Sequence, residues 1–211
     1  GSQGLGEDKG IERRSFLKTM LGGGAILLAG AGIVVEKKAW ASTIMLQDGR
    51  KIVLTKGVVV ADKGLCSGCR TCEAVCSTAN NSGLNSSQLV RLFVEKDYFA
   101  CDYTPHTCHQ CSDPICMEEC PEGAIHIDKV HGTNARIIDE SKCVGCEACV
   151  EACENRYGIP RPRFNPAKKV CIKCHLCYGE PECVKHCPLG ALKIVRSETG
   201  ILTGLPFIKE R

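Results

Sequence analysis

The residues of this chain that could do chemistry are its cysteines, of which there are eighteen among 211 residues. Sixteen of them fall into four groups of four, in which neighbouring cysteines are mostly separated by two to four residues. A disulfide framework scatters its cysteines, because each bridge joins two distant backbone segments. Close grouping brings several thiolates around one small object, which favours metal ligation.

The four groups, called motifs one to four in chain order, have spacings that distinguish between metals. Motifs one and three follow the pattern Cys-x2-Cys-x2-Cys-x3-Cys, which matches the bacterial 4Fe–4S ferredoxin spacing up to its final proline. Zinc sites use two separated Cys-x2-Cys pairs, so zinc is the weaker alternative. We therefore predict four 4Fe–4S clusters. The candidate ligands are Cys66, Cys69, Cys72 and Cys76 (motif one), Cys108, Cys111, Cys116 and Cys120 (two), Cys143, Cys146, Cys149 and Cys153 (three), and Cys171, Cys174, Cys183 and Cys187 (four).

The cluster itself explains this arrangement, because each of its four irons needs one thiolate. Two-residue spacers let three thiolates of a motif surround one cube, whereas the nearby fourth cysteine reaches a partner cube, as in two-cluster ferredoxins. Gly68 and Gly145 are expected to allow close approach of the backbone to a cluster. Histidines near the motifs are expected to tune cluster potentials through hydrogen bonds. They are His106, His109, His175 and His186.

The elements that position the motifs are repeated along the chain. The segment 60–69 parallels 138–146, and the segment 116–127 parallels 183–194. Branched, alternating residues predict short strands at 58–61, 124–127, 136–138 and 192–195. Helical turns are expected at Cys72–Cys76 and Cys149–Cys153. The predicted fold class is α+β, with tandem, duplicated bacterial ferredoxin-like units around four clusters.

The motifs, their order and their variations resemble the four-cluster iron–sulfur subunits of molybdenum and tungsten oxidoreductases. That family includes subunits of dimethyl sulfoxide reductase, nitrite reductase and aldehyde oxidoreductase systems, and the resemblance covers residues 58–195. It implies that motif one pairs with four, and two with three. The implied ligand sets are Cys66, Cys69, Cys72 with Cys187; Cys171, Cys174, Cys183 with Cys76; Cys108, Cys111, Cys116 with Cys153; and Cys143, Cys146, Cys149 with Cys120.

Two cysteines, Cys101 and Cys177, are left over. Cys177 could compete with Cys183, since Cys171-x2-Cys174-x2-Cys177 also has ferredoxin spacing. Cys183 is favoured, because the sequence from Cys183 to Pro188 reproduces the spacing from Cys116 to Pro121. The spare cysteines are expected to be buried thiols near a cluster, with a disulfide as the alternative.

The N-terminus has the pattern of an export signal. Residues 12–18 contain Arg13 and Arg14 followed by Phe-Leu, residues 21–35 are mildly apolar, and Ala39-Trp40-Ala41 is a small-x-small cleavage site. This resembles a twin-arginine signal, which carries folded proteins out of the cytoplasm. The expected location is the periplasm or the outer face of the cytoplasmic membrane. An uncleaved anchor is the alternative, although fifteen residues with five glycines are short for a span.

These features divide the chain into a signal at 1–41, an N-terminal extension at 42–57, two interleaved dicluster units at 58–195 and a tail at 196–211. A hairpin is expected around Asp48-Gly49. Residues 77–100 form an insertion that begins as a loop. Residues 155–169 hold five Lys or Arg and no acidic residue, which indicates either a solvated loop or a docking surface.

The charge balance bears on the partners. Residues 1–41 hold six Lys or Arg and four Asp or Glu, so the formal charge of +3 falls to +1 without them. Each bound cluster with four ionised thiols lowers the charge by about two, so the loaded protein is acidic. Nucleic acid is therefore not expected as a partner.

No nucleophile–base set, phosphate loop or dinucleotide fingerprint occurs in the sequence. The resemblance therefore implies an electron-transfer subunit with no catalytic site of its own. It would relay electrons to or from a catalytic subunit that holds a molybdopterin or tungstopterin cofactor. A membrane anchor, or a quinone- or cytochrome-linked protein, is a further candidate partner. The alternatives are a freestanding exported polyferredoxin, a hydrogenase-linked carrier, and a redox enzyme with an open iron.

Overall fold

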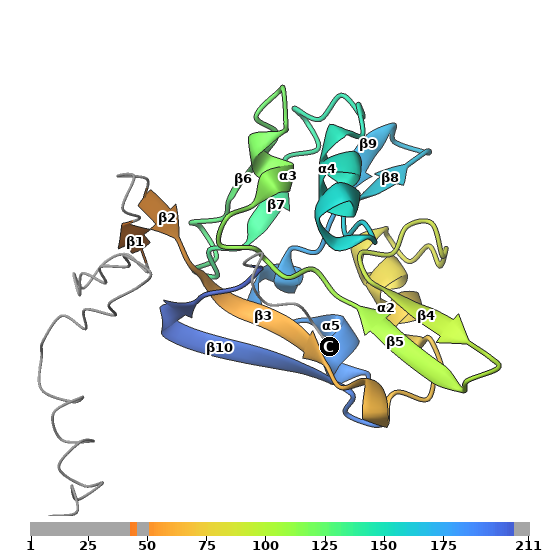
Figure 1. The fold of residues 1–211 in the computed structure, drawn as a ribbon. Coiled ribbons are helices and arrows are strands. Elements are labelled where there is room, and N and C mark those ends of the chain that lie inside the picture. Colours follow the sequence, from red (N-terminus) through yellow and green to blue (C-terminus); the bar gives the residue numbers. More distant parts are fainter. Residues whose placement is uncertain (1–42, 46–50, 205–211) are drawn as a thin grey trace, which may run out of the picture.

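The computed structural model describes residues 43–45 and 51–204 (Figure 1). The predicted signal at 1–41, the Asp48-Gly49 turn and residues 205–211 of the predicted tail lie outside the described residues. Among the helices in the described ranges, none combines the length and apolarity needed to cross a membrane.

In the described part of the chain, the strands pair into five separate antiparallel sheets of two strands each. The longest pairs β3 (Thr55–Ala61) with β10 (Leu192–Ile201), so the entry to motif one lies beside the exit from motif four. Two-stranded sheets are marginally stable on their own. The other pairs are β1 (Thr43–Met45) with β2 (Lys51–Val53), β4 (Phe93–Asp97) with β5 (Asp102–His106), β6 (Ile125–Ile127) with β7 (Arg136–Ile138), and β8 (Arg163–Asn165) with β9 (Val170–Ile172).

The sheets and helices are arranged in two halves (Figure 1). The lower half contains β3, β10, β4 and β5 with η1 (Lys63–Leu65), α2 (Thr71–Asn80) and α5 (Glu182–Lys185). The upper half contains β6 to β9 with α3 (Ile115–Glu118) and α4 (Ala148–Tyr157). Helix α2 packs against α5, and α3 packs against α4. Motif one therefore lies against motif four, and motif two against motif three.

The sequence repeat is also present in the backbone. Arg70 and Glu147, which both lie between the second and third cysteines of a motif, have φ values of 61° and precede the ten-residue helices α2 and α4. These helices confirm the helical turns predicted at Cys72–Cys76 and Cys149–Cys153. The four predicted short strands are confirmed as parts of β3, β6, β7 and β10.

Cysteines make up a large share of the interior, eight of the 23 buried apolar residues in the described part of the chain. In the lower half, Cys72, Cys76 and Cys183 are buried in one cluster with apolar side chains such as Leu92 and Leu176. In the upper half, three of the four buried members of the second cluster are cysteines. The buried thiols thus gather within each half of the molecule, among aliphatic side chains.

Two segments outside the repeat differ from the expected loops. The predicted loop start at Ser77 belongs to α2, which continues to Asn80. Side-chain hydrogen bonds hold the helix end, because Ser77 Oγ donates to the Leu84 carbonyl at 2.8 Å and Asn81 Nδ2 to the Ser77 carbonyl at 2.8 Å. In the segment 155–169, α4 continues to Tyr157 and β8 occupies the middle.

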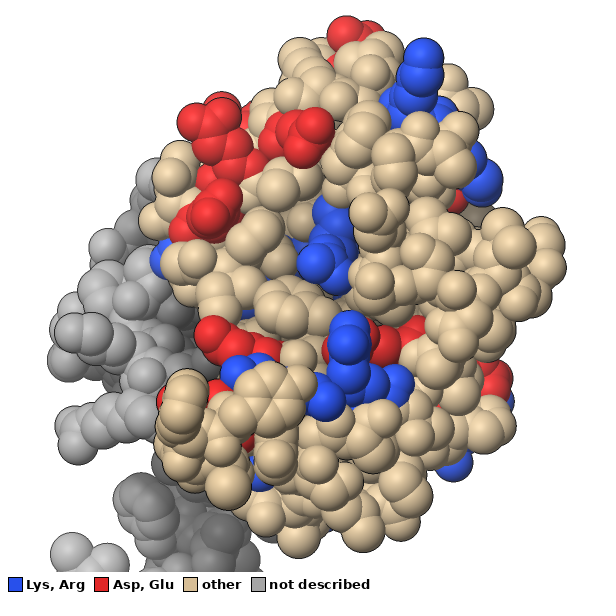
Figure 2. All heavy atoms as spheres, turned by 90° about the vertical axis from the view of Figure 1, so that its right-hand side faces the viewer, with Lys and Arg blue, Asp and Glu red and all other residues tan. Residues whose placement is uncertain are grey.

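The basic side chains of 155–169 do not form a free basic patch. Arg156 pairs with Asp113 at 3.5 Å, and Lys168 pairs with Glu140 at 2.7 Å. Arg161 is buried and donates to the Thr107 carbonyl at 2.8 Å. Figure 2 shows basic and acidic side chains interspersed over this side of the molecule. The solvated-segment interpretation is therefore favoured over a basic docking surface.

Gly145, inside motif three, provides a test of how tightly the repeat is packed. A Cβ added at Gly145 would run into the carbonyl oxygen of Lys169, whereas one added at Gly123 would meet nothing within 4 Å. Both glycines have positive φ, 71° and 57°, so alanine would strain the backbone at either position. We expect Gly145→Ala to lower the unfolding free energy by about 1–3 kcal/mol more than Gly123→Ala. Anaerobic urea denaturation measures the difference, and equal losses would contradict the contact.

Candidate metal centres

Three cavities in the structure are lined by candidate cysteines, four in two of them and five in the third. In each cavity three cysteines come from one motif, and one is the last cysteine of the motif packed against it. The fifth cysteine of the third cavity is Cys171 of motif four. These quartets have the membership that the family resemblance implies. We call them site I (Cys66, Cys69, Cys72, Cys187), site II (Cys108, Cys111, Cys116, Cys153) and site III (Cys143, Cys146, Cys149, Cys120).

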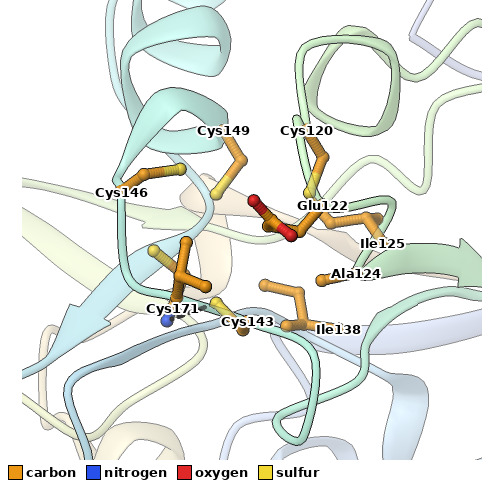
Figure 3. Close-up of a pocket in the computed structure, with 10 residues that line it drawn as sticks. Cys120, Glu122, Ala124, Ile125, Ile138, Cys143, Cys146, Cys149 and Cys171 are labelled. Atoms are coloured by element: carbon orange, nitrogen blue, oxygen red, sulfur yellow. Dashed lines mark hydrogen bonds between the residues drawn. The ribbon is translucent and has the colours of Figure 1, made fainter.

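Site III illustrates the common geometry (Figure 3). Cys143 and Cys146 are supplied by the loop that leads into α4, Cys149 by the first turn of α4, and Cys120 by the turn after α3. Their sulfurs face a shared space in the close-up. The short spacers of motif three thus let one stretch of backbone provide three corners, while the packing of α3 on α4 provides the fourth.

A fourth quartet lies deeper in the protein. Cys76 on α2 and Cys183 on α5 are buried in the same core cluster, against which Cys174 packs. After burial, the negative charges of Cys174, Cys76 and Cys177 are the main causes that raise the pKa of the Cys183 thiol. These four cysteines are therefore neighbours. We call them site IV (Cys76, Cys174, Cys177, Cys183).

Site IV differs from the predicted set at one position, because the structure does not bring Cys171 together with Cys76, Cys174 and Cys183. Cys171 lies on β9 and lines the cavity of site III. Its backbone N–H donates to Cys143 Sγ at 3.2 Å, and a hydrogen bond with the Cys149 thiol lowers its pKa to about 7.

Cys177 takes the place that was expected for Cys171. The extended backbone of β9 carries Cys171 towards the upper half, whereas residues 176–178 turn with positive φ towards α2 and α5. The other leftover cysteine, Cys101, was also expected to be a buried thiol, and it is instead exposed beside the β4–β5 turn. The expected burial is thus wrong for Cys101. The structure places Cys177 rather than Cys171 beside Cys76, Cys174 and Cys183, and the choice of ligand between them stays a prediction.

Backbone N–H groups approach several of these sulfurs. Arg91 N donates to Cys76 Sγ at 3.4 Å, and Arg161 N donates to Cys153 Sγ at 3.4 Å. Both cysteines are the last of a motif and belong to the site of the motif packed against theirs in the same half of the molecule. Hydrogen bonds of this kind stabilise the charged form of a thiolate, which is the form that binds metal.

Burial works against ionisation of the same thiols. It raises the pKa of Cys116 to about 11 and that of Cys72 to about 12. Such thiols keep their protons at neutral pH unless a cation ionises them, and bound iron would do so. Cys72 and Cys116 are therefore unsuited to remain as free thiolates and suited to bind metal.

The spacing of the thiols fits a cluster better than a single ion. Thiolates around a tetrahedral zinc lie roughly 4 Å apart, since each Zn–S bond is about 2.3 Å. Within residues 43–45 and 51–204, no three Cys, His, Asp or Glu side chains converge in a way that could hold one ion. A 4Fe–4S cube is larger and takes one thiolate at each corner. The quartets thus fit that group.

Site II also contains two buried cationic side chains, which would be stabilised by a bound anion. Arg136 and Lys173 line its cavity, and both side chains are almost fully buried. Arg136 Nε has no hydrogen-bond partner among the described residues. A buried cation without a counter-charge is costly, whereas a cluster with four thiolates carries negative charge. This feature therefore supports an anionic group at site II.

The four histidines contact protein groups in the structure. His106 Nε2 lies 2.8 Å from Glu95 Oε2, and His186 Nδ1 lies 3.0 Å from the Glu182 carbonyl. His109 lies 3.3 Å from Arg161, and His175 lies 3.3 Å from Arg91. Burial, followed by the charge of Arg91, lowers the pKa of His175 to about 4. Their predicted hydrogen bonds to cluster sulfur stay a prediction.

Sequence reasoning missed Cys177, Arg136 and Lys173. A signal for Cys177 was present, because Cys174-x2-Cys177-x5-Cys183-x3-Cys187-Pro188 parallels Cys108-x2-Cys111-x4-Cys116-x3-Cys120-Pro121 with one residue inserted. No comparable pattern marked the two cations, since isolated Lys and Arg are normally exposed.

Comparison with known proteins agrees with this geometry. Residues 99–197 match the family described as the 4Fe–4S dicluster domain. The aliphatic sulfonate oxidoreductase polyferredoxin-like subunit of Pyrococcus furiosus is 37% identical over 142 residues, which are 65% of this chain and 76% of that protein. YsaA of Escherichia coli K12, named as a candidate electron transport protein, is 33% identical over 149 residues, 66% of this chain and 90% of YsaA.

A third relative is named as a probable anaerobic dimethyl sulfoxide reductase chain, YnfG of Escherichia coli K12. It is 33% identical over 150 residues, which are 63% of this chain and 69% of YnfG. The cysteine quartets, the small paired strands and helices, and these relatives all point to one family. The chain belongs to the ferredoxin-like proteins that contain a 4Fe–4S dicluster domain.

Proposed function

We propose that this chain is an electron-transfer subunit that holds four 4Fe–4S clusters and serves a catalytic oxidoreductase subunit. The proposed ligands are the sixteen cysteines of sites I to IV, with Cys177 in place of Cys171. Each bound cluster would supply a one-electron redox centre. The observation that carries the proposal is that four quartets of cysteines lie in a row within one small protein.

Contacts between the quartets support the order I, IV, II, III. Cys72 of site I shares a core cluster with Cys76 and Cys183 of site IV. Burial and then the charge of Cys108, in site II, raise the pKa of Cys174 in site IV. Sites II and III meet in the second core cluster, which contains Cys116 and Cys149.

The exposure of the cysteines supports entry and exit of electrons at the two ends of this row. Cys69 in site I and Cys146 in site III are exposed, whereas every cysteine of sites II and IV is buried or half-buried. The end sites therefore lie at the surface, where a partner could exchange electrons. The inner sites can exchange electrons only through their neighbours.

A catalytic partner is supported by the relatives, two of which are named as an oxidoreductase subunit and a reductase chain. The finer proposal is that this partner holds molybdopterin or tungstopterin, as the family resemblance implies. A membrane anchor, or a quinone or cytochrome partner, would connect the other end. The twin-arginine pattern at Arg13 and Arg14 supports export to the periplasmic side, which cell fractionation of the native protein would test.

Anaerobic purification of the affinity-tagged chain from its own cells tests the proposed role. We expect a larger subunit to co-purify in fixed proportion, with about one molybdenum or tungsten per complex by elemental analysis. Native mass spectrometry identifies the partner. A loaded chain that purifies as a monomer would overturn the subunit role and favour a freestanding polyferredoxin.

A further inference from the structure

Two buried cations lie side by side in the middle of the molecule. Lys173 is 2% exposed and Arg136 is 1% exposed. Lys173 Nζ donates to the Arg136 carbonyl at 2.5 Å, which fixes the ammonium group against the start of β7. Buried Lys and Arg are rare in proteins unless they are paired with a negative group.

The acceptors of the hydrogen bonds that these cations donate are neutral groups. The Arg136 guanidinium donates to the carbonyls of Asn134 at 3.0 Å, Val53 and Ser112. Its Nε has no partner in the described part of the chain. In the described ranges, no carboxylate forms an ion pair with either side chain, and the negative groups that act on both are cysteines. The counter-charge must therefore come from the cysteine sites.

Their position is at the junction of sites II and IV. Both cations line the cavity of site II. Lys173 directly precedes Cys174 of site IV in the chain. Buried Gln110 connects the two sides, because its Nε2 donates to the Cys174 carbonyl at 2.8 Å and its Oε1 accepts from Arg136 N at 2.8 Å. The two inner sites, II and IV, thus both lie next to the positive charges of Lys173 and Arg136.

Sites I and III have a different electrostatic setting. Arg70 lines site I, yet it is about half exposed and paired with Glu73 at 2.5 Å. The lining of site III includes no Lys or Arg and does include Glu122. At sites I and III, solvent and carboxylates weaken the electric field of any positive charge. The low dielectric around the buried Lys173 and Arg136 leaves their field at sites II and IV strong.

We propose that Lys173 and Arg136 make the inner clusters, at sites II and IV, the most easily reduced of the four. Reduction adds one negative charge to a cluster, and a nearby buried cation stabilises the reduced form. An electron that enters at site I or III would therefore come to rest in the middle of the row. This inference rests on the proposed four-cluster function.

Removal of one charge tests the proposal. In Lys173→Met we expect the highest midpoint potential to fall by at least about 59 mV. For a one-electron centre, this shift lowers the ratio of reduced to oxidised cluster at a fixed potential tenfold. Anaerobic redox titration followed by electron paramagnetic resonance measures it. Cys108→Ser, which alters site II, identifies the signal that belongs there. Lys129→Met, at an exposed lysine, is the matched control and should leave every potential unchanged.

A second pair of variants separates charge from packing. Arg136→Met should shift the same signals downwards, and Arg136→Lys, which keeps the charge, should return them towards the wild-type values. Unchanged potentials in both methionine variants, or equal shifts in Arg136→Met and Arg136→Lys, would overturn the inference. Failure of the proposed function is distinguishable, because wild-type protein would then show fewer than four titrating clusters.

Discussion

A Cys177→Ser variant is expected to lose one complete cluster, so that iron falls from about sixteen to about twelve atoms per chain. The reason is that Cys177 lies with Cys76, Cys174 and Cys183, and serine is a poor ligand for the iron of a cube. Anaerobic iron and acid-labile sulfide analysis measures the loss. Electron paramagnetic resonance should show that one signal has disappeared.

Cys171→Ser is the matched control for that experiment. Cys171 lines site III, where Cys143, Cys146, Cys149 and Cys120 already supply four thiolates. We therefore expect about sixteen irons in this variant. Cys101→Ser, at an exposed cysteine outside the four quartets, should also keep them. Loss of about four irons in Cys171→Ser with none lost in Cys177→Ser would restore the ligand set that the spacing first indicated.

Stripping the clusters is expected to unfold most of the protein. In the described residues the five two-stranded sheets share no backbone ladder with one another, and eight of the 23 buried apolar residues are cysteines. Metal binding to such a core is also folding free energy, of order 10 kcal/mol for a structural site in small domains. Far-ultraviolet circular dichroism after anaerobic treatment with acid and chelator should therefore lose most of its helix and strand signal.

The reversal of that treatment serves as the control. Addition of iron and sulfide under reducing conditions should restore both the spectrum and the thermal transition, whereas zinc alone should not restore the native spectrum. An apoprotein that keeps a cooperative thermal transition close to that of the loaded protein would contradict a cluster-built core.

Much of the candidate site could be predicted because the metal dictates local spacing. Motifs one and three placed three ligands each around sites I and III without any knowledge of the tertiary structure. The short strands around them were also predictable from alternating branched residues. Local spacing fails where two cysteines offer the same separation. Cys171 and Cys177 both lie three positions from Cys174, so the choice between them needs the comparison with motif two or the path of β9.

The burial of Lys173 and Arg136 could not be predicted from the sequence for a related reason. Lys173 follows the apolar strand β9 and Arg136 begins β7, positions that are compatible with exposed side chains. Their burial depends on how the two halves pack around sites II and IV.

Quantification of iron and acid-labile sulfide in the anaerobically purified wild-type chain tests the four-cluster claim most directly. We expect about sixteen of each per chain, with four signals that titrate by one electron each in electron paramagnetic resonance. About eight irons, or stoichiometric zinc without labile sulfide, would contradict it.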